Sequence, residues 1–168
     1  NIKDNINLYY KGVLSKHWTI DLASDWYQQR TTSEQHLQEK MRFTEIYSRG
    51  NSSLWGFSPR AVYQARRTKI EVGGDWSKSV IRDWTTLNIA DAQPTDNTIQ
   101  EIKGAGYLGV DCTTPNQRWN MGLGLRFERT NKRYQDHAGK TETESFCYQT
   151  LLPSLSLSYA QEGWTHQL

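Results

Sequence analysis

The chain alternates apolar and polar residues over much of its length, and this period of two restricts its fold more than any other feature. In the stretch WNMGLGLRFERT, the odd positions from Trp119 to Phe127 are apolar, whereas the even positions hold Asn, Gly or Arg. A period of two is that of a β-strand with two unlike faces, and no helical stripe competes with it. The same alternation occurs in INLYYKGVL, WTIDLASDW, WGFSPRAVY, KIEVGGDW and PSLSLSY. The sequence therefore predicts an all-β fold.

Short and long connections alternate between the predicted strands. Tight turns are predicted near residues 15, 67, 116 and 162, and long polar loops at 28–52, 85–98 and 130–145. Within the first long stretch, LQEKMRFTEIY alternates loosely and predicts a β-extension. Short turns at one end and long loops at the other are typical of bacterial outer-membrane barrels. We therefore expect antiparallel up-and-down transmembrane β-barrel strands, seven plus the start of an eighth, as part of a larger barrel.

Alternation alone leaves open which face is inside. In a soluble β-sandwich or soluble barrel the apolar face packs into a core, whereas in an outer-membrane barrel it faces lipid. The hydrophobic share is 36% and the mean hydropathy is −0.81, and no run approaches the roughly 18 apolar residues of a membrane-spanning helix. A transmembrane barrel remains compatible with these values, because alternation keeps the mean hydropathy low.

Tryptophan positions favour the membrane. Trp18, Trp119 and Trp164 each follow a predicted tight turn directly, which predicts three indoles at one height. Trp26 lies eight residues beyond Trp18 on the same face, a rise of roughly 20 Å along a tilted strand. Two rims of an aromatic girdle are therefore predicted, and the upper rim also includes Trp55 and Trp76.

Charged residues occupy the opposite faces of the same predicted strands. In a barrel these side chains face the lumen. A lumen lined with charges of both signs can hold a plug through ion pairs and can conduct polar solutes. An alternative is that they merely solvate the interior. The lumen-facing candidates are Asp21, Asp25, Glu71, Asp75, Arg126 and Glu128.

Motifs for catalysis or cofactor binding do not find the context that they need. GAGYLG, residues 104–109, fits the dinucleotide fingerprint, but the stretch reads as a strand and is followed by a turn with Pro115, not by a helix. The four histidines have no metal-ligand spacing, and a net charge of +2 without a basic stripe gives no support for nucleic-acid binding. We expect no enzyme, no cofactor and no metal site. Cys112 and Cys147 are predicted at opposite ends of the wall, hence as free thiols.

Two stretches resemble a known family. GLRFERT, residues 124–130, and PSLSLSY, residues 153–159, are similar to the Gly-Leu-Arg-aromatic-Glu-x-Thr and Pro-Ser-x-Ser-aliphatic-Ser-aromatic strands of Bacteroidota TonB-dependent receptors, within the outer membrane protein beta-barrel family. The resemblance implies a barrel of about 22 strands in the bacterial outer membrane. It also implies a plug domain of the same receptor, indirect coupling to the TonB system and a surface lipoprotein as partner. Residues 1–168 are then a single, incomplete barrel segment without the plug.

The leading hypothesis is therefore part of an outer-membrane TonB-dependent barrel that takes up a nutrient ligand, either a metal chelate or an oligosaccharide. The alternatives are a small closed outer-membrane barrel acting as an adhesin or binding module, and a soluble β-sandwich binding domain.

Overall fold

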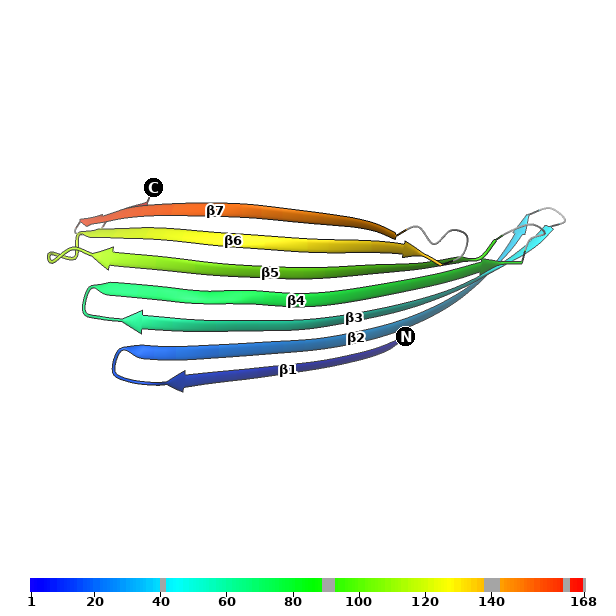
Figure 1. Ribbon diagram of the computed structural model, residues 1–168, viewed down its shortest axis with the longest axis horizontal. Helices are drawn as coiled ribbons and strands as arrows, with labels where there is room; N and C mark the ends of the chain where they lie inside the picture. Colours follow the sequence, from blue (N-terminus) through cyan, green and yellow to red (C-terminus); the bar gives the residue numbers. More distant parts are fainter. Residues whose placement is uncertain (40–41, 89–92, 138–142, 162–163, 168) are drawn as a thin grey trace.

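The computed structural model describes residues 1–39, 42–88, 93–137, 143–161 and 164–167. They form one antiparallel sheet in which each strand pairs with its neighbours in the chain (Figure 1). The all-β, up-and-down arrangement expected from the alternation is confirmed, including a short eighth strand. The strands are β1 (Ile2–Val13), β2 (Trp18–Glu39), β3 (Arg42–Gln64), β4 (Thr68–Leu87), β5 (Thr95–Thr113), β6 (Trp119–Asp136), β7 (Thr143–Gln161) and β8 (Trp164–Gln167).

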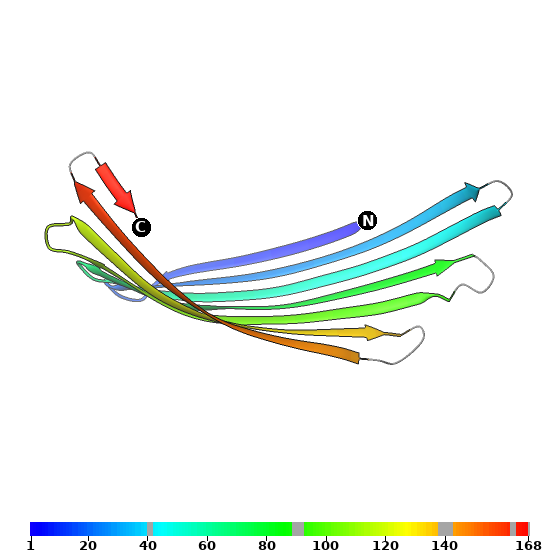
Figure 2. The ribbon, with the colours of Figure 1, turned by 90° about the horizontal axis from the view of Figure 1, so that it is seen from above.

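The sheet is a single curved layer without a core. Figure 2 shows the long strands bending together from one end of the sheet to the other. Among the described residues no hydrophobic side chain is buried, and no pairing joins β1 to β8. A soluble sandwich needs a second sheet packed about 10 Å away, which these residues do not form. The described residues contain no helix, and so none that could cross a membrane.

The predicted long loops are wrong in extent. Residues 28–52 were expected to be mostly loop, but β2 continues to Glu39 and β3 begins at Arg42. Likewise β4 runs to Leu87 and β6 to Asp136, so that 85–87, 95–98, 130–136 and 143–145 are strand. The β-extension predicted for LQEKMRFTEIY is confirmed where it is described. At this end the protein therefore presents long hairpins with short connections.

The short turns lie where the sequence predicts them, at the other end of the sheet. Residues 14–17, 65–67 and 114–118 connect the strands there, and the turn near 162 falls outside the described residues. In the third turn Gln117 has a φ of 57°, and the Thr114 carbonyl accepts a hydrogen bond from the Gln117 amide. The Trp119 amide in turn donates to the Thr114 hydroxyl at 3.0 Å. This local geometry starts β6 at Trp119.

The two faces of the sheet differ in crowding. On the polar face, a Cβ added to Gly122 or Gly124 would collide with the hydroxyl of Ser156 or Ser154 on β7. On the apolar face, a Cβ added to Gly104 or Gly106 would meet no atom within 4 Å. Side chains converge on a concave face and diverge on a convex one, so these four positions are what a sheet with its polar face inside the curve would show. Gly74 departs from this pattern, because a Cβ there on the apolar face would lie 2.8 Å from the Ala105 carbonyl oxygen.

Candidate functional site

The tryptophans that follow the short turns lie along one oblique line across the sheet. Followed across the sheet by its register partners, Trp18 on β2 is level with Leu123 on β6, four strands away. Trp119 lies four residues nearer the turns than Leu123, a shift of one residue per strand. Trp164 begins β8, which lies six strands from β2. It is six residues nearer the turns than the level of Trp18, so it continues this line. A shift of one residue, about 3.3 Å, for each strand spacing of about 4.8 Å inclines this line by about 35° to the perpendicular of the strands. Outer-membrane barrel strands tilt by about 35–45°, so the line would be level in such a barrel.

A second line of tryptophans runs parallel to the first, eight residues farther along the strands. Trp26 lies directly opposite Trp55, with ring centroids 6.4 Å apart. Trp76 lies two residues nearer the turns than Lys78, the register partner of Trp55. Since β4 is two strands from β2, a line with a shift of one residue per strand through Trp26 passes through this position. Eight residues along a strand tilted by about 35° rise by about 22 Å, close to the apolar band of about 25 Å in outer-membrane barrels.

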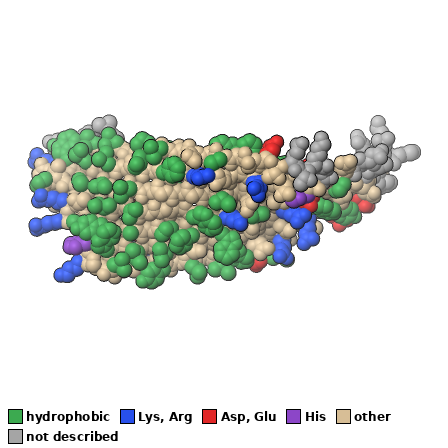
Figure 3. Space-filling view, viewed as in Figure 1, with side chains coloured by type: hydrophobic (Ala, Val, Ile, Leu, Met, Phe, Trp, Pro, Cys, Tyr) green, Lys and Arg blue, Asp and Glu red, His purple; other side chains and the backbone are tan. Residues whose placement is uncertain are grey.

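The apolar face between these two lines carries no charge, and we call it the apolar belt (Figure 3). Many of its side chains are exposed, with Leu155 at 72% and Leu123 at 62% of their full accessible surface, whereas others such as Ile20 are half-buried. A continuous exposed apolar surface of this size marks an interaction with lipid or protein. On β2 to β7 the belt consists of Trp18, Ile20, Leu22, Ser24, Trp26, Trp55, Phe57, Pro59, Ala61, Tyr63, Thr68, Ile70, Val72, Gly74, Trp76, Gly104, Gly106, Leu108, Val110, Cys112, Trp119, Met121, Leu123, Leu125, Phe127, Leu151, Pro153, Leu155, Leu157 and Tyr159.

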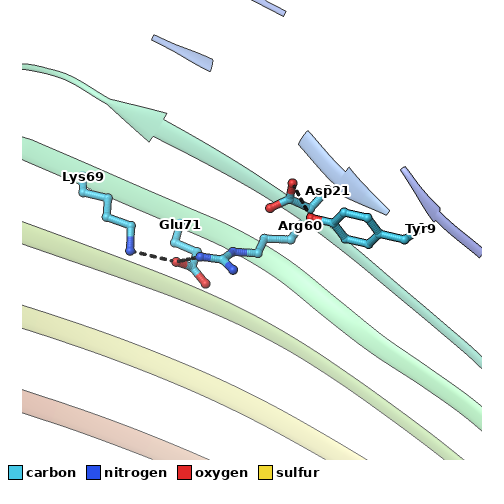
Figure 4. Close-up of polar contacts among 5 residues, drawn as sticks. All are labelled: Tyr9, Asp21, Arg60, Lys69 and Glu71. Carbon is cyan, nitrogen blue, oxygen red and sulfur yellow. Dashed lines mark hydrogen bonds and ion pairs between the residues drawn. The ribbon is translucent and has the colours of Figure 1, made fainter. Parts of the chain in front are cut away.

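Near the turns, a polar cluster extends over β1 to β4 on the other face (Figure 4). Glu71 accepts a hydrogen bond from the Arg60 guanidinium at 2.9 Å and lies 3.2 Å from the Lys69 ammonium. The Tyr9 hydroxyl donates to Asp21 at 3.2 Å, and Asp21 is the register partner of Arg60. Side chains thus join β1 to β2 and β3 to β4, and the register of β2 with β3 places the two pairs side by side.

A second polar cluster joins β4 to β6 across β5. The Arg126 guanidinium lies 2.9 Å from the Asp75 carboxylate and 2.5 Å from that of Glu128. It also lies over the ring of Tyr107, 5.7 Å from the centroid. Ion pairs that span a strand in this way stabilise one register of three strands, and they leave both signs of charge on the polar face.

Gly73 makes room for the ring of this cluster. A Cβ at Gly73 would lie 2.5 Å from the Tyr107 hydroxyl and 2.8 Å from the carbonyl oxygen of Pro59. The second of these is backbone, which cannot turn aside as a side chain can. Glycine at this position therefore permits the close approach of Tyr107 to β4, and Tyr107 in turn supports Arg126.

All six predicted lumen-facing residues lie on the polar face, but they do not form one site. Asp75, Arg126 and Glu128 come together, and Asp21 and Glu71 belong to the cluster nearer the turns. Asp25 lies beside Gly56, whose added Cβ would be 3.4 Å from its carboxylate, and it lines the same hollow as Asp75, Arg126 and Glu128 without an ion pair to them among the described residues. The orientation toward a lumen stays a prediction for all six.

Four residues that complete these clusters are not among the predicted site residues: Tyr9, Arg60, Lys69 and Tyr107. For Arg60 and Lys69 a signal was present, because each lies on the polar phase of an alternating stretch. Tyr107 had no such signal, since both faces of GYLGVDC are partly apolar.

Cross-strand pairs hold the long hairpins together beyond the apolar belt. Arg82 donates two hydrogen bonds to Asp96, at 3.0 and 2.6 Å. The hydrogen bond from Arg82 holds the pKa of the Asp96 carboxyl below its ordinary value. Nearer the tip of the first hairpin, His36 lies 3.1 Å from Glu34 and 3.7 Å from Glu45.

The described residues contain no group of three or more His, Cys, Asp or Glu arranged to hold a metal ion. GAGYLG lies within β5, a strand that is followed by a turn and not by a helix. The prediction of two free thiols is confirmed. Cys112 lies near the turn end of β5 and is level in register with Leu157 on β7. Cys147 lies ten residues farther along β7 from that position.

No family model and no curated protein matches the chain. Solved structures with a similar backbone include the ferric citrate transporter FecA in its unliganded form, at a TM-score of 0.74 and 17% identity over 97% of this chain. The ferric yersiniabactin uptake receptor FyuA from Yersinia pestis matches at a TM-score of 0.71 and 16% identity over 94% of this chain. The copper transporter OprC matches at a TM-score of 0.75 and 10% identity over 94% of this chain.

The chain spans about a quarter of the length of these structures, at 26%, 25% and 28% in the same order. At such low identity the likeness shows the fold alone. The eight antiparallel strands have the fold of a section of the barrel wall of TonB-dependent receptors.

Proposed function

We propose that this chain forms a section of the wall of an outer-membrane barrel that takes up a nutrient ligand with energy from a TonB system. One observation carries the proposal: an uncharged belt about 22 Å high lies on one face of the sheet, while charged clusters cover the other face at the same level. In a lipid bilayer this arrangement places the belt against acyl chains and the polar face toward an aqueous interior. The tryptophans of the two lines then lie at the two membrane interfaces.

The wall contributes enclosure and a polar lining, and no bond is made or broken on it. The Arg126 and Glu71 clusters offer charges of both signs to a plug domain inside the barrel. The long hairpins extend beyond the belt, where they can capture a ligand outside the cell. Passage would follow displacement of the plug, driven indirectly by TonB, and a surface lipoprotein could assist capture.

A metal chelate is the ligand class we favour. FecA, FyuA and OprC are a ferric citrate transporter, a ferric yersiniabactin receptor and a copper transporter. An oligosaccharide is the second candidate, and it goes with the Bacteroidota resemblance, which rests only on the motifs at 124–130 and 153–159.

Conductance of the purified full-length protein in a planar bilayer tests this function without knowledge of the ligand. We expect little steady current in buffer, because the plug fills the lumen. We expect the plug to unfold before the barrel in moderate urea, so that discrete channel openings appear that close again on removal of urea. A pore that is open without urea would contradict a plugged receptor. A membrane-inserted protein with no current even in urea would indicate a small barrel filled by side chains.

A further inference from the structure

Six basic residues lie on the outward continuation of the apolar face, directly beyond the apolar belt on the side of the long hairpins. They occur within the first three outward-facing positions past the belt on their strands (Figure 3). We call them the basic collar: Arg30, Arg49, Lys78, Arg82, Arg129 and Arg133.

No acidic residue interrupts these positions on β2 to β7. Acidic side chains on the outward face begin one position farther out, with Glu34 and Asp96. Of the six collar residues only Arg82 has an ion pair in the described part of the chain, to Asp96. Among the described residues, five of the six collar side chains therefore have no ion-pair partner.

The inward face at the same level is different. It holds two basic and two acidic side chains, and three of them form ion pairs: Lys103 and Lys132 lie 2.9 and 3.9 Å from Glu101. The fourth, Glu128, pairs with Arg126. The segregation of positive charge to the outward face is thus a property of that face and not of the region as a whole.

We propose that the basic collar binds anionic, phosphate-bearing headgroups of the lipid leaflet on the long-hairpin side. This inference rests on the proposed function, since it takes the apolar belt to lie among acyl chains. Two residues along a strand tilted by about 35° rise by about 5 Å, and the polar headgroup layer is about 5–7 Å thick on each side of a bilayer. Lys78 and Arg129 occupy the first position, about 5 Å past the belt, and therefore lie in this layer. Arg30 occupies the second position, about 11 Å past the belt, and reaches back to the layer with its long side chain. Guanidinium groups bind phosphate through paired hydrogen bonds, and basic residues beside a membrane attract anionic lipid.

Tryptophan quenching by brominated lipids tests the proposal on the reconstituted full-length protein. Trp26, Trp55 and Trp76 lie in the top row of the belt, directly below the collar, so lipids bound to the collar bring bromine to them. The probes are phosphatidylcholine and phosphatidic acid, both brominated in their acyl chains. We expect phosphatidic acid to quench more strongly than phosphatidylcholine at equal mole fraction, and high salt to reduce the difference.

The triple variant Arg30→Gln, Lys78→Gln, Arg129→Gln should lower the relative affinity for phosphatidic acid on the order of tenfold at these sites. A matched control removes three positive charges from the opposite face, as Lys3→Gln, Lys103→Gln, Lys132→Gln, and should keep the preference. Equal quenching by both lipids in the wild type, or equal loss in both triple variants, would overturn the collar. Failure of brominated phosphatidylcholine to quench at all would instead contradict the lipid-facing belt, and with it the proposed function.

Discussion

Leu155→Arg is expected to destabilise the membrane-inserted protein by about 2–4 kcal/mol, the cost of a basic residue on the lipid face near the bilayer midplane. Leu155 lies halfway between the two tryptophan lines, four residues from Leu151 and four from Tyr159, and 72% of its surface is exposed. In a water-soluble protein, arginine at such an exposed position would change stability by less than about 0.5 kcal/mol. The same substitution therefore separates lipid from water on this face.

The neighbouring position supplies the control. Ser154 is on the same strand at nearly the same height, but its hydroxyl lies on the polar face beside Gly124. Ser154→Arg should cost less than about 1 kcal/mol, because its charge remains in a hydrated interior. Both variants of the full-length protein would be unfolded by urea in lipid vesicles, with wild type alongside. Similar small effects at both positions would contradict a lipid-facing Leu155.

Arg126→Glu is expected to lower the free energy of unfolding by about 1–3 kcal/mol. The change removes the cation between Asp75 and Glu128 and brings three carboxylates together. Breaking a fully buried ion pair costs about 3–5 kcal/mol, but 36% of the Arg126 side chain is exposed, so the larger figure is reduced by hydration. Urea unfolding in lipid vesicles measures the change.

Arg60→Gln is the matched comparison, because Glu71 keeps Lys69 when Arg60 is lost. Its effect should stay below about 1 kcal/mol. The charge swap Arg126→Asp with Asp75→Arg should recover part of the loss, whereas two independent sites would give additive losses. An Arg126→Glu variant as stable as Arg60→Gln would show that the pairs spanning β5 contribute nothing.

The sequence predicted strands well only where their two faces meet different surroundings. Within the belt, WNMGLGLRFERT alternates because one face is the apolar one, which we propose meets lipid, and the other carries polar groups. Beyond the belt both faces of a strand are hydrated, so nothing requires alternation. For this reason 28–52, 85–98 and 130–145 looked like loops, although β2, β3, β4 and β6 continue into them.

The polar clusters were harder to predict, because their partners are set by register. Arg126 and Asp75 are 51 residues apart in the chain and meet across β5 only because two turns place β4, β5 and β6 in this alignment. The parity of each residue along its strand is readable from the sequence, and it placed all six candidates on one face. The register is not readable in the same way, so the choice of Tyr107 as the ring beneath Arg126 could not be anticipated.

Accessibility along β6 tests most directly whether the apolar face meets lipid. Spin labels would be placed singly at residues 120 to 128 of the full-length protein in bilayers, after Cys112→Ser and Cys147→Ser remove the native thiols. We expect collisions with oxygen, which concentrates in lipid, to peak at Met121, Leu123, Leu125 and Phe127. Collisions with a water-soluble nickel chelate should be highest at the even positions wherever the lumen is hydrated. Odd positions that meet the nickel chelate as often as the even ones would contradict the account.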